Sequence, residues 1–187
     1  TDFIGGTREQ ASRNANAAQV IAIWQVPSFA GGMDEMNPVL QYAVSWFEGQ
    51  GDTGNTGGAG VSEVEQEGWD PFFENQGGGK IYNTLFNYTN SFIHEVSLTV
   101  TPMEDVATTL SWTGMWLDKE IAESGTLGLL APGGSAIASV SVNNNETHLG
   151  NEFDLVTTYD YTEDVQFGLN LGWFIPGDVF TGGNQAT

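Results

Sequence analysis

Two carboxylates, Glu152 and Asp154, stand two residues apart in the alternating segment Glu152-Phe153-Asp154-Leu155. In an extended strand this spacing puts both side chains on one face, where a carboxylate pair can serve as general acid and base. A strand that lines a water-filled space shows the same spacing. No nucleophile elbow, phosphate-binding loop or zinc motif accompanies the pair. We therefore favour the lining interpretation and expect that the protein is not an enzyme.

A second group of acids lies in a Gly- and Asn-rich stretch and is a weak candidate for Ca²⁺, which prefers several oxygen ligands. Its members are Asp52, Glu63, Glu65, Glu67 and Asp70. A solvated acidic loop explains the same residues, and we favour it. The chain has no cysteine and only 2 histidines, which excludes thiol chemistry and Cys-based metal sites. We expect no other cofactor and no metal on the strands.

The charge balance narrows the classes of partner. The chain has 24 acidic against 4 basic residues, a net charge of −20. Nucleic acids and anionic lipids are bound through Lys and Arg, so the sequence argues against both as charge partners and against transport of a polyanion. Abundant glycine (25 residues) and 12% aromatic residues are typical of a β-rich chain. No run of about 18 apolar residues suggests a transmembrane helix.

Period-two alternation predicts six strands in three hairpins. The strands cover residues 19–26, 39–48, 94–102, 106–116, 152–161 and 165–174. Short turns at 102–105 and 162–164 alternate with long Gly-rich connections at approximately 50–80 and 118–150, whereas residues 7–18 fit a short helix. Alternating short turns and long external loops are the layout of outer-membrane barrels. The expected fold is all-β: one antiparallel, transmembrane up-and-down β-barrel segment over residues 1–187.

The alternation also assigns side chains to two faces. The apolar face, with Leu110, Trp112, Leu169 and Leu171, is expected to contact lipid. The polar face is expected to line the lumen with Glu95, Glu152, Asp154, Asp160, Gln166 and Asn170. Aromatic girdles are expected at both rims. Trp46, Trp116 and Trp173 fall at the outer rim, and Tyr42, Tyr159 and Tyr161 at the periplasmic rim.

His94 shares parity with the lipid-facing Val96, and two explanations remain open. It lies at the membrane interface, or a bulge beside residues 92–93 changes its face. Strand length favours the membrane, because residues 106–116 at a tilt of roughly 40° span about 25 Å, the height of an outer-membrane apolar band. A soluble β-sandwich, whose strands are usually shorter, is the alternative fold.

Two stretches carry a resemblance to a known family. Residues 91–118 and 149–177 resemble the late hairpins of the alginate-export family of outer-membrane proteins. In the second, the acids Glu152 and Asp154 lead to Tyr159 and Tyr161, and the return strand ends in residues 174–178, Phe-Ile-Pro-Gly-Asp. Residues 46–52 and 68–73 resemble a loop of the same family. The resemblance covers roughly residues 19–180 and implies a monomeric barrel of about eighteen strands, of which this chain holds six.

The resemblance and the charges together set the expected function. Alginate exporters guide a polyuronate through a basic funnel, whereas the predicted strands here contain no Lys or Arg. We therefore expect a bacterial outer-membrane channel, porin-like in its transport, that passes cations or neutral solutes. The expected partners are outer-membrane lipid and lipopolysaccharide, and further barrel strands in the same or another chain. The alternatives are a structural or adhesive surface protein with a plugged barrel, and a soluble β-sandwich binding module.

Overall fold

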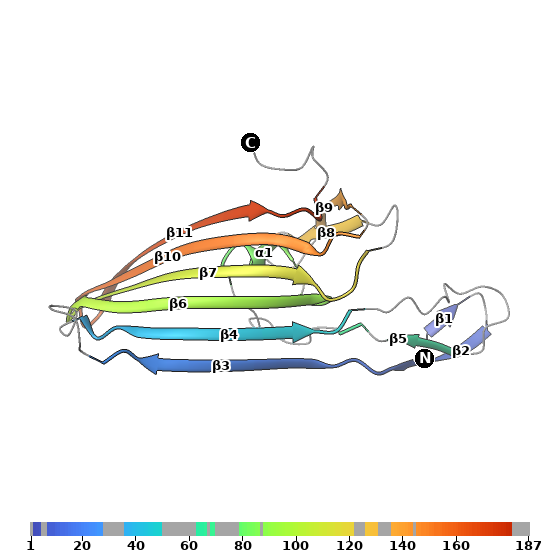
Figure 1. Ribbon diagram of the computed structural model, residues 1–187, viewed down its shortest axis with the longest axis horizontal. Coiled ribbons are helices and arrows are strands. Elements are labelled where there is room, and N and C mark those ends of the chain that lie inside the picture. Colours follow the sequence, from blue (N-terminus) through green and yellow to red (C-terminus); the bar gives the residue numbers. More distant parts are fainter. Residues whose placement is uncertain are drawn as a thin grey trace.

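A six-stranded antiparallel sheet forms the centre of the molecule (Figure 1). The computed structural model describes residues 2–4, 7–27, 36–49, 63–66, 68–69, 79–86, 88–121, 126–130, 136–143 and 145–180. The strand order is β11-β10-β7-β6-β4-β3. The strands are β3 (Ala17–Gln25), β4 (Val39–Phe47), β6 (Ser91–Met103), β7 (Val106–Leu117), β10 (His148–Thr162) and β11 (Val165–Pro176). The all-β prediction and its six strands are confirmed.

Smaller elements lie outside this sheet. β1 (Asp2–Ile4), β2 (Thr7–Arg13) and β5 (Glu63–Gln66) form a three-stranded sheet, and β8 (Thr126–Leu130) pairs with β9 (Ala136–Ser141). The helix expected over residues 7–18 is wrong, because β2 pairs with β1 on one side and with β5 on the other. Pairing with distant segments outweighs a weak helix propensity here. Both long connections therefore contain strands of their own.

The six strands follow one another as a meander, and two of them begin three or more residues before the positions that alternation predicts. β6 begins at Ser91 and β10 at His148, three and four residues before the predicted starts at 94 and 152. In β10 the register shifts between His148 and Gly150, and Gly150 has a φ of 146°. This irregularity interrupts the period of two, so the first residues of the strand do not show in the sequence pattern.

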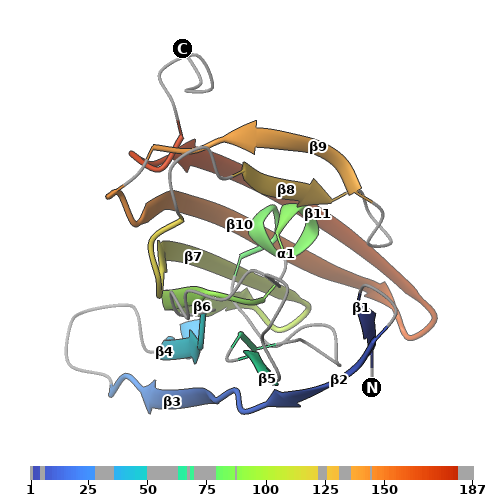
Figure 2. The ribbon, with the colours of Figure 1, turned by 90° about the vertical axis from the view of Figure 1, so that its right-hand side faces the viewer.

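The sheet curves (Figure 2). Its two faces differ in composition. The convex face carries a cross-strand row formed by Trp24, Leu40, Leu98, Leu110, Leu155 and Leu171. Several of these side chains are more than half exposed, among them Leu110 at 56% and Leu171 at 55%. The convex apolar residues are therefore not the core of a sandwich in the described part of the chain.

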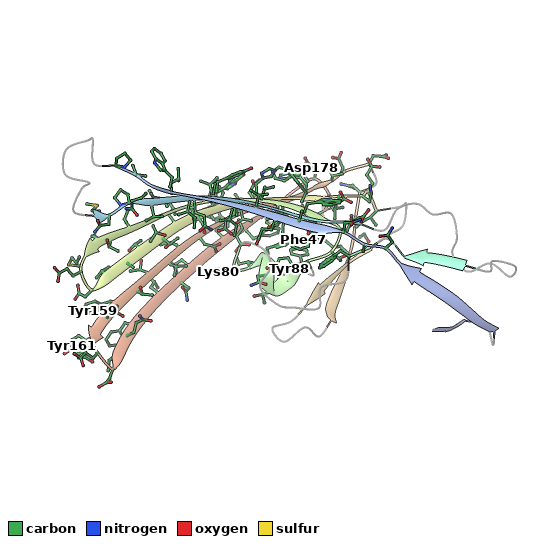
Figure 3. All side chains as sticks on the ribbon, turned by 90° about the horizontal axis from the view of Figure 1, so that it is seen from below. Phe47, Lys80, Tyr88, Tyr159, Tyr161 and Asp178 are labelled. Atoms are coloured by element: carbon green, nitrogen blue, oxygen red, sulfur yellow. The ribbon has the colours of Figure 1, made fainter. Side chains whose placement is uncertain are left out.

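The packed core lies on the concave face, near the end of the sheet that carries the long connections. Phe47, Ile93, Met115, Leu117 and Leu149 come from the strands of the sheet. They pack with Tyr82, Phe86, Tyr88, Val142, Val179 and Phe180. Figure 3 places Phe47 and Tyr88 in this region and Tyr159 and Tyr161 at the opposite, short-turn end. The sheet thus buries segments that lie within its own curve.

The sheet is open. β3 and β11 each have a neighbour on one side only among the described strands. The described residues include one α-helix, α1 (Tyr82–Leu85), which lies inside the curve of the sheet (Figure 2). No helix of the described residues is both long and apolar enough to cross a membrane.

Candidate functional site on the concave face

Three polar side chains form one cross-strand row on the concave face. Glu95 of β6 lies opposite Thr113 of β7, which lies opposite Glu152 of β10. Asp154 follows in the next row, opposite Ser111. Glu152 and Thr113 are fully buried and Asp154 is 2% exposed. Acidic side chains are rarely buried to this extent unless the structure supplies hydrogen bonds to them.

The Glu152 carboxylate receives three backbone hydrogen bonds from the segment that leads into α1. Oε1 accepts from the N–H groups of Lys80 and Ile81, the latter at 2.6 Å, and Oε2 accepts from the N–H of Tyr82 at 2.7 Å. The first N–H groups of a helix lack partners within the helix, and α1 has no side-chain cap of its own. Glu152 therefore caps α1 from a strand about 70 residues away, and the donors stabilise its buried charge.

Gly79 makes this approach sterically possible. Its φ is +83°, in the region that side-chain-bearing residues rarely adopt. A Cβ added to Gly79 would lie 2.7 Å from Glu152 Oε2. A residue with a side chain at position 79 would therefore push the segment away from the carboxylate that holds it.

The segment also covers the neighbouring acid. A Cβ added to Gly172 would lie 2.8 Å from Asp154 Oδ1 and 3.2 Å from Ile81 Cδ1, so these three residues meet at one point of the wall. Asp154 Oδ1 and Thr113 Oγ1 are buried and have no hydrogen-bond partner in the described part of the chain. Polar atoms buried in this way destabilise a fold by about 1–3 kcal/mol each.

Aromatic packing holds the other end of the segment. The Tyr82 ring stacks on Phe86 at 5.0 Å and meets Tyr88 at 5.9 Å, and Phe86 contacts Phe174 of β11 at 5.9 Å. Tyr88 packs in turn on Phe47 of β4 at 5.7 Å. Burial raises the pKa of the Tyr82 phenol to about 12, so this ring remains neutral over the ordinary pH range. Residues 79–86, which we call the inner segment, are thus fixed by acidic side chains, chiefly Glu152, and by one aromatic cluster.

The remaining predicted lumen residues lie on the same face, between the row of Asp154 and the short-turn end. Asp160 pairs across the strands with Gln166, and Gln166 Nε2 donates to Asp160 Oδ1 at 2.6 Å. Asn170 lies two cross-strand positions from Gln166 on the same face. Asp160, Gln166 and Asn170 are all exposed. The six residues therefore form two groups: three acids at the inner segment and three polar residues toward the short-turn end.

The predicted aromatic residues lie on the convex face, with one level corrected. Trp46 and Trp116 share a row through Phe92, and Tyr159 and Tyr161 pack with Phe167 at the short-turn end. Tyr42 is two rows from Trp46, in the row that runs through Val96, Trp112 and Phe153 to Trp173. Tyr42 therefore lies at the level of Trp173, so these two residues do not belong to opposite girdles as predicted. β4 begins opposite Thr99, whereas β6 continues to Met103. This stagger moves Tyr42 away from the short-turn end of the sheet.

Polar groups on the convex face pair with one another. The Tyr42 hydroxyl lies 2.7 Å from His94 Nδ1, and Trp112 Nε1 donates to Asn151 Oδ1 at 3.0 Å. The hydroxyls of Thr108 and Thr157 lie 3.2 Å apart. The register is regular through residues 92–94 on both neighbouring strands, so the bulge considered for His94 is excluded. His94 therefore faces outward.

The Ca²⁺ candidates fall largely outside the described residues. Asp52, Glu67 and Asp70 lie there, and only the backbone of Glu63 and Glu65, on β5, is described. Elsewhere in the described part of the chain, no three His, Cys, Asp or Glu side chains form a group suited to a metal ion.

Comparison of the chain with models of protein families and with curated proteins finds no match. The resemblance to the alginate-export family therefore stays an expectation. The inner segment is what sequence reasoning missed. Its signal was an aromatic run, Tyr82, Phe86 and Tyr88, after the glycines at 77–79, in a stretch without strand alternation.

Proposed function

We propose that this chain is a sector of an outer-membrane β-barrel channel that passes cations or neutral solutes. The observation that carries the proposal is the pairing of polar groups on an exposed apolar face. Tyr42 with His94 and Trp112 with Asn151 satisfy one another on the convex face. In water such groups need no protein partner, whereas in hydrocarbon each unsatisfied group is expensive.

The open edges support the same proposal. Five successive antiparallel pairings run from β11 to β3, so the two edge strands point in opposite directions. Further strands in even number can therefore join the edges into an all-antiparallel barrel. We propose that these strands come from the same or another chain, because an unpaired edge is not tolerated in lipid. The resemblance to a family of larger barrels agrees with this arrangement.

The charges of the concave face support preference for cations. The six strands carry Glu95, Glu152, Asp154 and Asp160 on that face and no Lys or Arg on either face. Carboxylates along a pore favour cations and repel polyuronates. Neutral solutes fit the hydroxyl and amide groups beside them, such as Ser97, Ser111 and Asn170.

Conductance of the full-length protein in a planar lipid bilayer tests the proposal. We expect steady conductance with a reversal potential that favours cations. Asp160→Asn, on the concave face, should lower the cation preference, whereas Asp164→Asn, in the β10–β11 turn, should leave it nearly unchanged. A sealed membrane or a preference for anions would contradict the proposal.

The aromatic cluster on the concave face favours a second candidate, a structural or adhesive surface protein with a plugged barrel. In that case the long connections at approximately 50–80 and 118–150 carry the binding. Deletion of these connections would then abolish partner binding and leave permeability unchanged. A channel predicts that permeability changes, because residues 79–86 follow the first connection directly and pack inside the sheet.

A further inference from the structure

We infer that the inner segment narrows the channel and that Glu152 is the residue that positions it. This inference rests on the proposed channel function. It gives a role to residues 79–86, which lie outside the six strands. The inner segment lies within the curve of the sheet, with α1 on the concave side (Figure 2). In a closed barrel that side is the lumen, so residues 79–86 occupy space that a solute would cross.

The anchor is concentrated on one carboxylate. Three consecutive N–H groups, those of Lys80, Ile81 and Tyr82, donate to the two oxygens of Glu152. Hydrogen bonds to a charged acceptor are stronger than those between neutral groups. Loss of this one side chain removes all three bonds, whereas the bonds of Asp154 to the Lys80 backbone and of Glu95 to the Gly79 backbone remain. Glu152 is therefore a positioning residue that acts on the pore through the segment it holds.

The attached state also has a cost in free energy. Asp154 Oδ1 and Thr113 Oγ1 are buried without a hydrogen-bond partner in the described part of the chain. When the inner segment leaves the wall, Asp154 Oδ1 and the Glu152 carboxylate become accessible to water. The free energy of hydrating these groups offsets part of the free energy that is lost when the backbone hydrogen bonds and the aromatic contacts break.

The wall beneath the segment is acidic, so detachment changes selectivity as well as width. Glu152 and Thr113 share a row with Glu95, and Asp154 lies in the next row. Ile81 lies against Gly172, beside Asp154, and shields it. With the segment displaced, Asp154 and Glu152 become exposed beside the half-buried Glu95, at two adjacent levels of the pore. Conductance and cation preference should therefore rise together.

The first test compares Glu152→Ala with Asp160→Ala in the full-length protein in lipid. Both variants remove one concave-face carboxylate from β10, but the Asp160 carboxyl bonds Gln166, far from the inner segment. We expect amide hydrogen exchange at Ile81 and Tyr82 to accelerate roughly tenfold or more in Glu152→Ala and to stay unchanged in Asp160→Ala. Single-channel conductance should rise about twofold or more in Glu152→Ala only, because of the space that a turn of helix occupies.

A reversible crosslink tests the segment in a second way and does not depend on the Glu152 variant folding. The chain has no cysteine, so Ile81→Cys with Gly172→Cys introduces one isolated pair. A Cβ at Gly172 would lie 3.3 Å from Ile81 Cγ1, within the range that a disulfide can bridge. The oxidised pair should hold the low conductance even with Glu152→Ala, and a reductant should restore the high conductance. Gly172→Cys alone is the control.

The outcomes separate this inference from the proposed function. A conducting protein whose conductance is the same with Glu152→Ala, and with the disulfide open or closed, overturns the inference and leaves the channel intact. Unchanged exchange at Ile81 and Tyr82 in Glu152→Ala overturns it as well. A protein that conducts in none of these forms overturns the channel and the narrowing role together.

Discussion

The hydroxyl of Tyr42 and Nδ1 of His94 lie 2.7 Å apart on the convex face of the sheet, on neighbouring strands. His94 is one of two histidines in the chain and sits among apolar and aromatic side chains, with Phe92 at 4.7 Å and Trp116 at 5.6 Å between ring centroids. The pair thus satisfies a polar ring on a face that we propose contacts lipid.

A double-mutant cycle on this pair measures its environment. Tyr42→Phe should destabilise the protein by roughly 1 kcal/mol, because it leaves His94 Nδ1 without its partner. With Tyr42→Phe and His94→Val combined, the coupling energy should be about 0.5–2 kcal/mol. Urea unfolding from lipid vesicles gives the values, with Tyr159→Phe at the short-turn end as control. Additive effects would show that water, not lipid, solvates the pair.

Substitution of Gly79 should loosen the inner segment while a matched glycine tolerates the same change. Gly79→Ala forces a positive φ of 83° on alanine and a Cβ 2.7 Å from Glu152 Oε2, so we expect a loss of about 1–3 kcal/mol in local stability. Gly168→Ala, in β11, meets no atom within 4 Å and should be neutral or slightly stabilising. Limited proteolysis between residues 79 and 86 reports the difference. Equal cleavage of the two variants would contradict the described packing at Gly79.

Tyr82 gives the inner segment a dependence on alkaline pH. Its pKa is 10.0 in the unfolded reference and about 12 in the folded protein, because burial disfavours the charged phenolate. The stabilisation is fully present below pH 10 and is lost as the pH rises to about 12, up to about 3 kcal/mol in total. Tyr82→Phe should remove this dependence.

Amide exchange of residues 79–86 measured against pH checks the Tyr82 prediction. The wild-type protein should show accelerating exchange above pH 10, beyond the normal increase that Tyr82→Phe also shows. Tyrosinate absorbance, compared between the two proteins, should place the titration of Tyr82 above that of exposed tyrosines. A Tyr82 that ionises near pH 10 without loss of the segment would contradict its burial.

An arginine on the convex face should prevent stable insertion, whereas its neighbour on the concave face should tolerate one. Leu110 lies in the convex row that runs from Trp24 to Leu171, and its side chain is 56% exposed. Thr109, the preceding residue, lies on the concave face. Leu110→Arg should reduce folding into vesicles by about 2–4 kcal/mol if this level lies near the bilayer midplane. Thr109→Arg should fold nearly as well and lower the cation preference. Equal tolerance at both positions would argue against lipid contact.

The sequence predicted the strands because alternation in the sheet is regular. The β6–β7 and β10–β11 pairings are in register over most of their length, so a period of two places Glu95 and Asp154 on one face and Leu110 on the other, as the structure does. The level of Tyr42 could not be predicted in the same way. It depends on the stagger between β4 and β6, two strands that residues 48–90 separate in the sequence.

The inner segment was beyond the reach of pattern reasoning for a different reason. Its position depends on the bonds from residues 80–82 to Glu152, about 70 residues away. The alternation of a strand is the same whether a carboxylate on its polar face is hydrated or accepts hydrogen bonds from a backbone segment. The aromatic residues Tyr82 and Phe86 indicated that this segment is buried. The neighbouring sequence did not indicate that it packs against the concave face of the sheet.

The most direct test of lipid contact compares two adjacent residues of β11 in the full-length protein reconstituted in vesicles. Leu171 lies on the convex face at 55% exposure, and Asn170 lies on the concave face opposite Val156. The chain has no cysteine, so Leu171→Cys and Asn170→Cys each carry one spin label. We expect the label at 171 to be relaxed by lipid-dissolved oxygen and the label at 170 by a water-soluble nickel complex. Labels at both positions that respond only to the nickel complex would contradict a lipid-facing convex surface.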